Sequence, residues 1–246
     1  MEVAKDRTAG APGGRLGAVV DVAIWLGVVV LEAVVVSRLG GRTPSGAFTR
    51  LAAPAEMLVL LIVATMLMRR RGEGWRSVGL APPASIRRVA GLVVGGYLAA
   101  IASNAACVLL AFPALGLSPP SFGALGALQG HPWAFAQWLV VAWVSAAVGE
   151  ELQFRGFLWS RIERLFGGSR WAVAPTLVVQ AGLFGLGHIY QGLGGALVTG
   201  GMGLVLGVVF LAGRRNLVGC MVLHGLIDTI SLTAMFFGAV PTAAAP

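Results

Sequence analysis

The chain alternates long apolar runs with short polar connections. An apolar run of about 18 or more residues is long enough to cross the bilayer as a helix, because the hydrocarbon core is about 30 Å thick. The runs of this kind, some of them interrupted by single polar residues, are 16–37, 51–68, 89–112, 132–157, 171–188, 194–212 and 216–237. The pattern predicts an all-α, polytopic transmembrane helical bundle of about seven spans.

The sixth of these runs has a stripe of small residues. Small side chains recur there at every fourth position, namely at Gly195, Thr199, Gly203 and Gly207. Residues at this spacing share one face of a helix, and small residues on a face allow a neighbouring backbone to approach closely. We interpret the stripe as a packing surface.

Composition excludes a water-soluble globule. The 246 residues are 57% hydrophobic and only 11% charged, whereas an ordinary soluble domain carries about a quarter charged residues. The net charge of +8 does not indicate nucleic-acid binding, because the basic residues lie almost entirely in the connections between spans. Cys107 and Cys220 lie inside apolar runs and provide neither a disulfide framework nor a metal-site spacing.

The basic residues predict the topology. They concentrate in alternate connections, around 69–88, 161–170 and 214–215, while 113–131 and 189–193 contain no Lys or Arg. By the positive-inside rule the basic connections are cytoplasmic. The arginines of the first connection, Arg38, Arg42 and Arg50, do not follow the rule.

The same rule orients the two ends of the chain. A polar amino-terminal segment, residues 1–15, is expected in the cytoplasm, and the uncharged carboxyl tail outside. Residues 16–240 then form a single transmembrane domain, whose motif-bearing core is about 132–237. The first apolar run is too long for the core of a signal peptide, so we expect it to be retained.

Acidic residues inside spans are costly when they are charged and unpaired. Those within the predicted spans are Asp21, Glu32, Glu56, Glu150, Glu151 and Asp228. We expect Asp21 and Glu56, near span ends, to reach headgroup water. Glu32 is deeper, and we assign it no functional role.

The fourth span contains the run Gly-Glu-Glu-Leu-Gln-Phe-Arg-Gly from Gly149 to Gly156. Glu151 and Arg155 are four residues apart and therefore share a helical face, in the orientation that favours an ion pair. Glu150 is rotated by about 100° and can face a different neighbour. We expect Glu151 and Arg155 to neutralise one another, which leaves Glu150 as a candidate acid–base residue.

Two further spans carry histidines. The fifth ends with Phe184 and His188, and the seventh has His224 and Asp228 four residues apart on one face. A single intramembrane histidine is more often a helix–helix hydrogen-bonding residue than a catalyst. Two such histidines, in spans that follow an acid-bearing one, favour a common site. Peptide hydrolysis needs a base for water, a proton donor and a group that stabilises an oxyanion, and these residue types can supply all three.

The three motifs together resemble those of the CAAX-processing and bacteriocin-immunity family of intramembrane proteases. The motifs are Glu-Glu-x-x-x-Arg, Phe-x-x-x-His and His-x-x-x-Asp, and the resemblance covers about residues 149–231. It implies that Glu150 and His188 activate a water, and that His224 and Asp228 stabilise the oxyanion or complete the site. The eukaryotic CAAX endopeptidases have Asn at the last motif position, where this chain has Asp228.

The resemblance leaves metal dependence open, since the family has been interpreted both as metalloprotease and as metal-free glutamate protease. Glu150, His188, His224 and Asp228 are candidate ligands for a divalent metal such as zinc. No His-Glu-x-x-His motif is present, and we favour the glutamate type.

The motifs do not specify a substrate beyond a membrane-associated peptide or protein in the lipid bilayer. The expected location is a bacterial inner membrane. Two alternatives remain at this point. Intramembrane acids and histidines also build the proton relays of coupled transporters, although no repeat symmetry between halves is visible. A non-catalytic scaffold or immunity protein could keep the same motifs.

Overall fold

The computed structural model describes residues 14–40, 46–125 and 128–240, and within these ranges the chain forms helices and connections without a β-strand. The amino-terminal half contains α1 (Gly14–Gly40), α2 (Gly46–Arg69), α3 (Ile86–Ala106) and α4 (Phe112–Leu115). The carboxyl-terminal half contains α5 (Pro132–Val141), α6 (Trp159–Leu165), α7 (Val173–Leu186), α8 (Gly192–Ala212) and α9 (Val218–Phe236). The predicted all-α fold class is confirmed. Most of the predicted amino-terminal segment, including Lys5 and Arg7, lies outside the described residues, as does Arg42.

Six helices in the described ranges are long and apolar enough to cross a membrane. They correspond to all the predicted spans except the fifth. That span, predicted over 171–188, forms the 14-residue helix α7, which at 1.5 Å per residue is about 21 Å long and shorter than the hydrocarbon core. The helix ends at Leu186, and Gly187 and His188 form a turn before the short helix Ile189–Gln191.

The predicted fourth span is part of one continuous helix, Pro132–Leu165, of 34 residues. Between α5 and α6 it is wound as a π-helix in the segments Ala142–Glu150 and Leu152–Leu158. π-Helical turns are rare and are frequent at functional sites. The two segments lie on either side of Glu151, so the candidate acidic pair occupies the irregular part of this helix.

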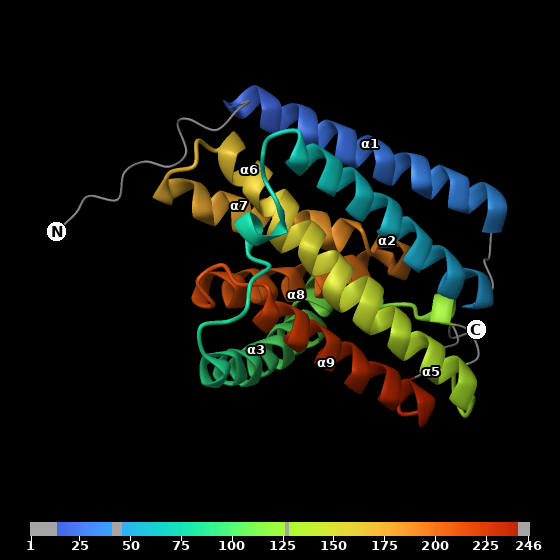
Figure 1. Ribbon diagram of the computed structural model, residues 1–246. Helices are drawn as coiled ribbons and strands as arrows, with labels where there is room; N and C mark the ends of the chain where they lie inside the picture. The colour runs from blue at the N-terminus through green and yellow to red at the C-terminus, as the bar shows by residue number, and fades with distance from the viewer. Residues whose placement is uncertain (1–13, 41–45, 126–127, 241–246) are drawn as a thin grey trace.

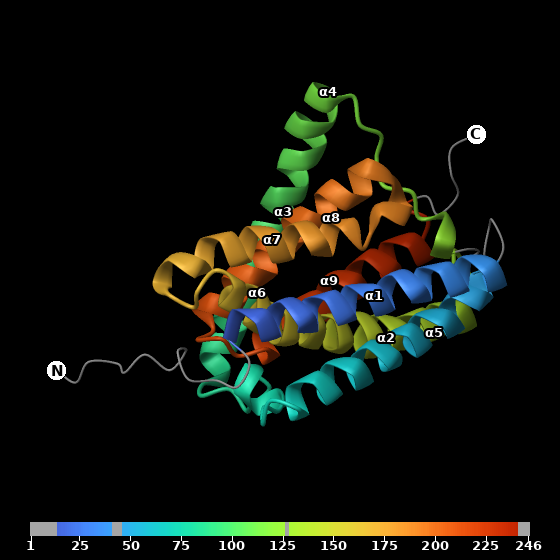
Figure 2. The same cartoon turned by 90° about the horizontal axis from the view of Figure 1, so that it is seen from above.

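The long helix lies between two hydrophobic cores. One core contains Phe157 and Leu158 together with residues of α1 and α2, and the other contains Trp159 with residues of α3, α8 and α9. In Figure 1 the long helix crosses the molecule diagonally, beside α2 on one side and α9 on the other. Seen from above in Figure 2, α3 and α4 stand steeply across the remaining helices.

Helices α7 and α8 pack through small residues, as the stripe predicts. A Cβ atom at Gly203 would come within 3.0 Å of the Ala181 backbone, and one at Gly207 would collide with Leu177. On the α7 side, a Cβ at Gly185 would collide with the Ala196 carbonyl oxygen of α8. This close approach positions the end of α7, and with it His188, against α8.

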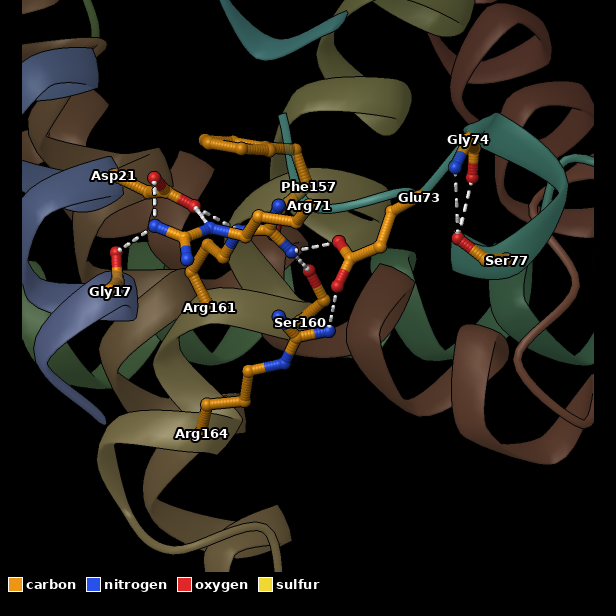
Figure 3. A network of polar contacts seen from close by, with 10 residues as sticks. All are labelled: Gly17, Asp21, Arg71, Glu73, Gly74, Ser77, Phe157, Ser160, Arg161 and Arg164. Atoms are coloured by element: carbon orange, nitrogen blue, oxygen red, sulfur yellow. Dashed lines mark hydrogen bonds and ion pairs between the residues drawn. The ribbon is translucent and has the colours of Figure 1, made fainter. Parts of the chain in front are cut away.

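Charged residues from three segments meet at one end of the bundle (Figure 3). Asp21 on α1 accepts hydrogen bonds from Arg71 and Arg161, and Glu73 accepts from Arg161 and Arg164. Asp21 is only 2% exposed and Arg161 is fully buried. The expectation that Asp21 reaches headgroup water is therefore wrong, because two arginines neutralise it inside the protein.

The other basic connection reaches the same end. Arg215 bonds to Glu163 of α6 at 2.5 and 2.6 Å, and these hydrogen bonds raise the pKa of the Arg215 guanidinium above its ordinary value. The Leu217 N–H donates to the Gly79 carbonyl oxygen. All three basic connections thus lie together, as the topology requires.

The two uncharged connections also contact each other. The Ser121 N–H donates to the Gln191 carbonyl oxygen at 3.0 Å. Close by in sequence, the Gly130 N–H donates to the Phe236 carbonyl oxygen at the end of α9. The bundle therefore gathers the three basic connections at one end and the two connections without Lys or Arg away from them, while Arg38 lies in the last turn of α1.

Candidate active site

The predicted ion pair between Glu151 and Arg155 is present and is confirmed. Arg155 Nη1 donates to Glu151 Oε1 at 2.8 Å, and both side chains are fully buried. Arg155 Nη2 donates to the Gly203 carbonyl oxygen of α8 at 3.0 Å. Its guanidinium carbon lies 4.5 Å from the centre of the Phe184 ring, a distance at which a cation is attracted to the ring face.

His224 on α9 binds the same carboxylate. Its Nδ1 lies 2.9 Å from Glu151 Oε1, the oxygen that also accepts from Arg155. A carboxylate paired with an arginine is an acceptor, so the Nδ1 of His224 carries the proton in this bond. The other ring nitrogen, Nε2, lies 3.6 Å from Asp228 Oδ2, which is beyond hydrogen-bond length. Asp228 has 29% of its side chain exposed.

His188 comes from the turn that follows α7. Its Nδ1 lies 2.9 Å from the Phe184 carbonyl oxygen. A carbonyl oxygen only accepts, so Nδ1 carries the proton, and in the neutral ring Nε2 has a free lone pair. The ring also stacks near Phe184 and Tyr190, at centroid distances of 5.1 and 5.8 Å.

Glu150 differs from Glu151 in its surroundings. It is partly exposed, and its buried Oε2 atom has no hydrogen-bond partner among the described residues. Within the same described ranges no hydrogen bond joins Glu150 to His188 directly.

Phe184 contacts more of the site than its place in the motif indicates. Its ring touches the Arg155 guanidinium, His188 and His224, and it also packs edge-on against Phe154 at 4.9 Å. Its place four residues before His188, the spacing of neighbours on one helical face, was the available signal.

Gln180 was also missed. Its Nε2 atom donates to the Gly203 carbonyl oxygen that accepts from Arg155. Gln180 precedes Phe184 by four residues on the same helix, and a polar residue within an apolar run was a usable indication. This bond ties α7 to the same point of α8 as the ion pair.

The candidate metal ligands do not form a metal site in this conformation. In the part of the chain that the structure describes, no three His, Cys, Asp or Glu side chains lie together in an arrangement that could hold a metal ion. One ring nitrogen of His224 is bonded to Glu151 and the other faces Asp228. A zinc site needs at least three converging donors, and these side chains do not supply them in this arrangement.

The fold and this cluster define a class: an integral, multi-pass membrane protein that buries carboxylates, an arginine and histidines inside a helical bundle. Comparison with known protein families found a match to one family of membrane endopeptidases. Residues 132–230 match the family described as type II CAAX prenyl endopeptidase, Rce1-like.

The segment that carries the motifs is therefore similar to the CAAX-processing family of membrane endopeptidases, in agreement with the resemblance of the motifs. The matched segment includes all six candidate residues: Glu150, Glu151, Arg155, His188, His224 and Asp228. Searches of the curated proteins and of the solved structures found no match.

Proposed function

We propose that this protein is an intramembrane endopeptidase of the glutamate type, with Glu150 as the base that activates water. The observation that carries the proposal is the difference between the two adjacent glutamates. Glu151 is buried and held through its Oε1 atom by Arg155 and His224. Glu150 is partly exposed and makes no such hydrogen bond within the described residues. The Oε2 atoms of both glutamates are buried without a partner there. Only Glu150 is free to exchange a proton with a water and a substrate.

Hydrolysis can be assigned to the residues step by step. Glu150 takes a proton from water, and the hydroxide oxygen adds to the scissile carbonyl carbon. His188 is proposed to hold this water through Nε2, since its Nδ1 is held by Phe184. When the carbon–nitrogen bond breaks, protonated Glu150 returns its proton to the leaving amine, so that a carboxylate and an amine are formed.

The proposed group that stabilises the oxyanion is His224. Its Nδ1 is anchored to Glu151, so in the doubly protonated ring an Nε2–H is left to donate to the oxyanion. Asp228, 3.6 Å from this nitrogen, would orient the ring and balance its charge. Glu151 and Arg155 then act by positioning His224, and they do not contact substrate in this scheme.

The distribution of arginines between the two ends of the bundle supports an orientation of the protein in the membrane. The basic end formed by the three arginine-bearing connections would face the cytoplasm, which puts the start of α1 there as well. We propose a bacterial inner membrane as the location, with residues 16–240 as one catalytic domain. The substrate would be a membrane-associated peptide or protein that reaches the site from within the bilayer.

The test compares the carboxyl termini of membrane proteins in cells that produce the wild-type chain or the variant Glu150→Gln. New carboxyl termini should appear only with the wild-type chain, because the amide cannot take up the proton. Treatment of the purified protein with a chelator should leave cleavage of such a substrate unchanged. Equal cleavage by the variant would eliminate Glu150 as the base. Activity lost on chelation and restored by one equivalent of zinc would favour a metalloprotease.

A further inference from the structure

The family match begins at residue 132 and does not include the first three spans. One contact nevertheless joins α1 directly to the irregular part of the long helix. Trp25 Nε1 donates to the Gln153 Oε1 atom at 2.7 Å, across 128 residues of sequence. Trp25 is 4% exposed and Gln153 is fully buried. A short hydrogen bond between two buried side chains fixes the position of both.

Gln153 lies between the two members of the central ion pair. It is two residues after Glu151 and two before Arg155, inside the π-helical segment Leu152–Leu158. Its Nε2 atom has no hydrogen-bond partner in the described part of the chain. Within that part, the Gln153 side chain is therefore held by its bond from Trp25. The segment begins at Leu152, directly after the two glutamates, and contains Arg155.

A chain of aromatic rings extends the same contact into the site. The Trp25 ring packs edge-on against Phe154, at 5.9 Å between centroids, and Phe154 packs edge-on against Phe184, at 4.9 Å. Phe184 in turn contacts Arg155, His188 and His224. Edge-on pairs at these distances are attractive and orient both rings.

We propose that Trp25 is a positioning residue for the active site, and that α1 is a working part of the catalytic unit. Trp25 holds the π-helical segment through Gln153 and supports the Phe184 ring through Phe154. This inference rests on the proposed function, since it takes the cluster around Glu151 as the site. A shift of about 1 Å in catalytic groups can lower a rate by about 100-fold, so such support bears on turnover.

The test uses Trp25→Phe, which keeps an aromatic ring and removes the indole N–H donor. Trp138→Phe is the matched control: its indole N–H donates to the Leu125 carbonyl oxygen at 3.1 Å, and it is similarly buried at 7%. We expect Trp25→Phe to lower kcat by about 10- to 100-fold with KM within about twofold. Trp138→Phe should lower the unfolding temperature to a similar extent with kcat almost unchanged.

A second variant removes the acceptor. Gln153→Met has a similar volume, and the double variant Trp25→Phe/Gln153→Met should lose no more kcat than the worse single variant, because both remove one contact. Equal loss of kcat in Trp25→Phe and Trp138→Phe, or fully additive losses in the double variant, would overturn the positioning role.

Glu150→Gln, measured in the same assay, distinguishes failure of the proposed function from failure of the positioning role of Trp25. If it stays active, the proposed function fails. If it is inactive while Trp25→Phe matches wild type, only the role of Trp25 fails.

Discussion

Glu150 and Glu151 are adjacent carboxylates with different partners. Glu151 has its charge balanced by a fully buried arginine, whereas Glu150 is partly exposed and has no ion pair within the described ranges. The helix turns the two side chains to different neighbours, and the fold supplies cationic donors to only one of them. At the residue scale, the proposed chemistry depends on this difference.

Glu150 and His188 are expected to act on one water, so their substitutions should not add. Glu150→Gln should lower kcat by about 100- to 10,000-fold, the usual contribution of general acid–base catalysis. His188→Ala should have a comparable effect, and the double variant should be little worse than either single one. Thermal unfolding of the purified variants serves as the control, with little change expected for Glu150→Gln. If the decrease in kcat of the double variant equals the product of the two single decreases, the two residues do not act on a shared water.

Arg155 should be required for folding as well as for rate. Arg155→Ala leaves Glu151 as a buried carboxylate without its arginine, which costs about 3–5 kcal/mol of stability. The matched control is Arg164→Ala, because Arg164 pairs with Glu73 but has 27% of its side chain exposed, and exposed pairs contribute about 0–1 kcal/mol. Chemical denaturation in detergent measures both. A fully stable Arg155→Ala variant would show that the pair is dispensable.

Asp228 is expected to orient His224 and not to exchange the proton itself. Asp228→Asn keeps an acceptor oxygen near Nε2 of His224 and restores the residue of the eukaryotic CAAX endopeptidases. We expect it to retain activity within about tenfold of wild type, whereas Asp228→Ala, which removes the acceptor, should lose about 1–3 kcal/mol of transition-state stabilisation. Both are measured as kcat/KM. If Asp228→Asn is inactive and Asp228→Ala is active, Asp228 does not orient His224 through an acceptor oxygen.

At the scale of elements, the close approach of α7 and α8 places His188. Gly185→Ala would push a Cβ atom into the Ala196 carbonyl oxygen and the Gly200 backbone, which cannot yield as a flexible side chain can. We expect the variant to separate the helices, to lose stability by about 1–3 kcal/mol and to lower kcat. Gly182→Ala, one turn earlier on α7, is the control, since its Cβ meets no atom within 4 Å. If both variants behave alike in unfolding and in rate, the packing explanation fails.

The short α7 and the π-helical segments also belong to this scale. The apolar run around 171–188 predicts a full span, but the helix ends at Leu186 after 14 residues. Hydropathy measures how apolar a segment is and does not show where its helix ends. The π-helical winding around Glu151 likewise has no periodic signal in the sequence, because the same residues can form an α-helix.

At the scale of the whole molecule, the bundle has two chemically different ends. The basic end is tied together by Asp21, Glu73 and Glu163 with arginines from three connections. We predict that single cysteines at Arg76 and Arg170 are labelled from the cytoplasmic side, and one at Ser121 from the outside. Labelling with a membrane-impermeant maleimide, in intact and in opened cells of a Cys107→Ala/Cys220→Ala background, measures this. Outside labelling at Arg76 would reverse the topology.

The sequence alone determined the membrane class, the apolar runs, the sequence positions of the basic connections and the three motifs. These are local properties: hydropathy, charge and spacing act within one helix, so the pair of Glu151 and Arg155 could be predicted from a separation of four residues. The order of the acid-bearing and histidine-bearing spans favoured a common site, and the family resemblance supported it, but the spacing of these residues in sequence does not state which helices are neighbours.

The tertiary structure decided which atoms meet. His224 bonds to the oxygen of Glu151 that Arg155 already occupies, and Phe184 contacts three of the site residues. Asp21 seemed by its position near a span end to face water, yet it is buried against Arg71 and Arg161. Trp25 reaches Gln153 from a helix 128 residues away. Such contacts depend on how helices distant in sequence pack and rotate against each other, and no local pattern of residues encodes that.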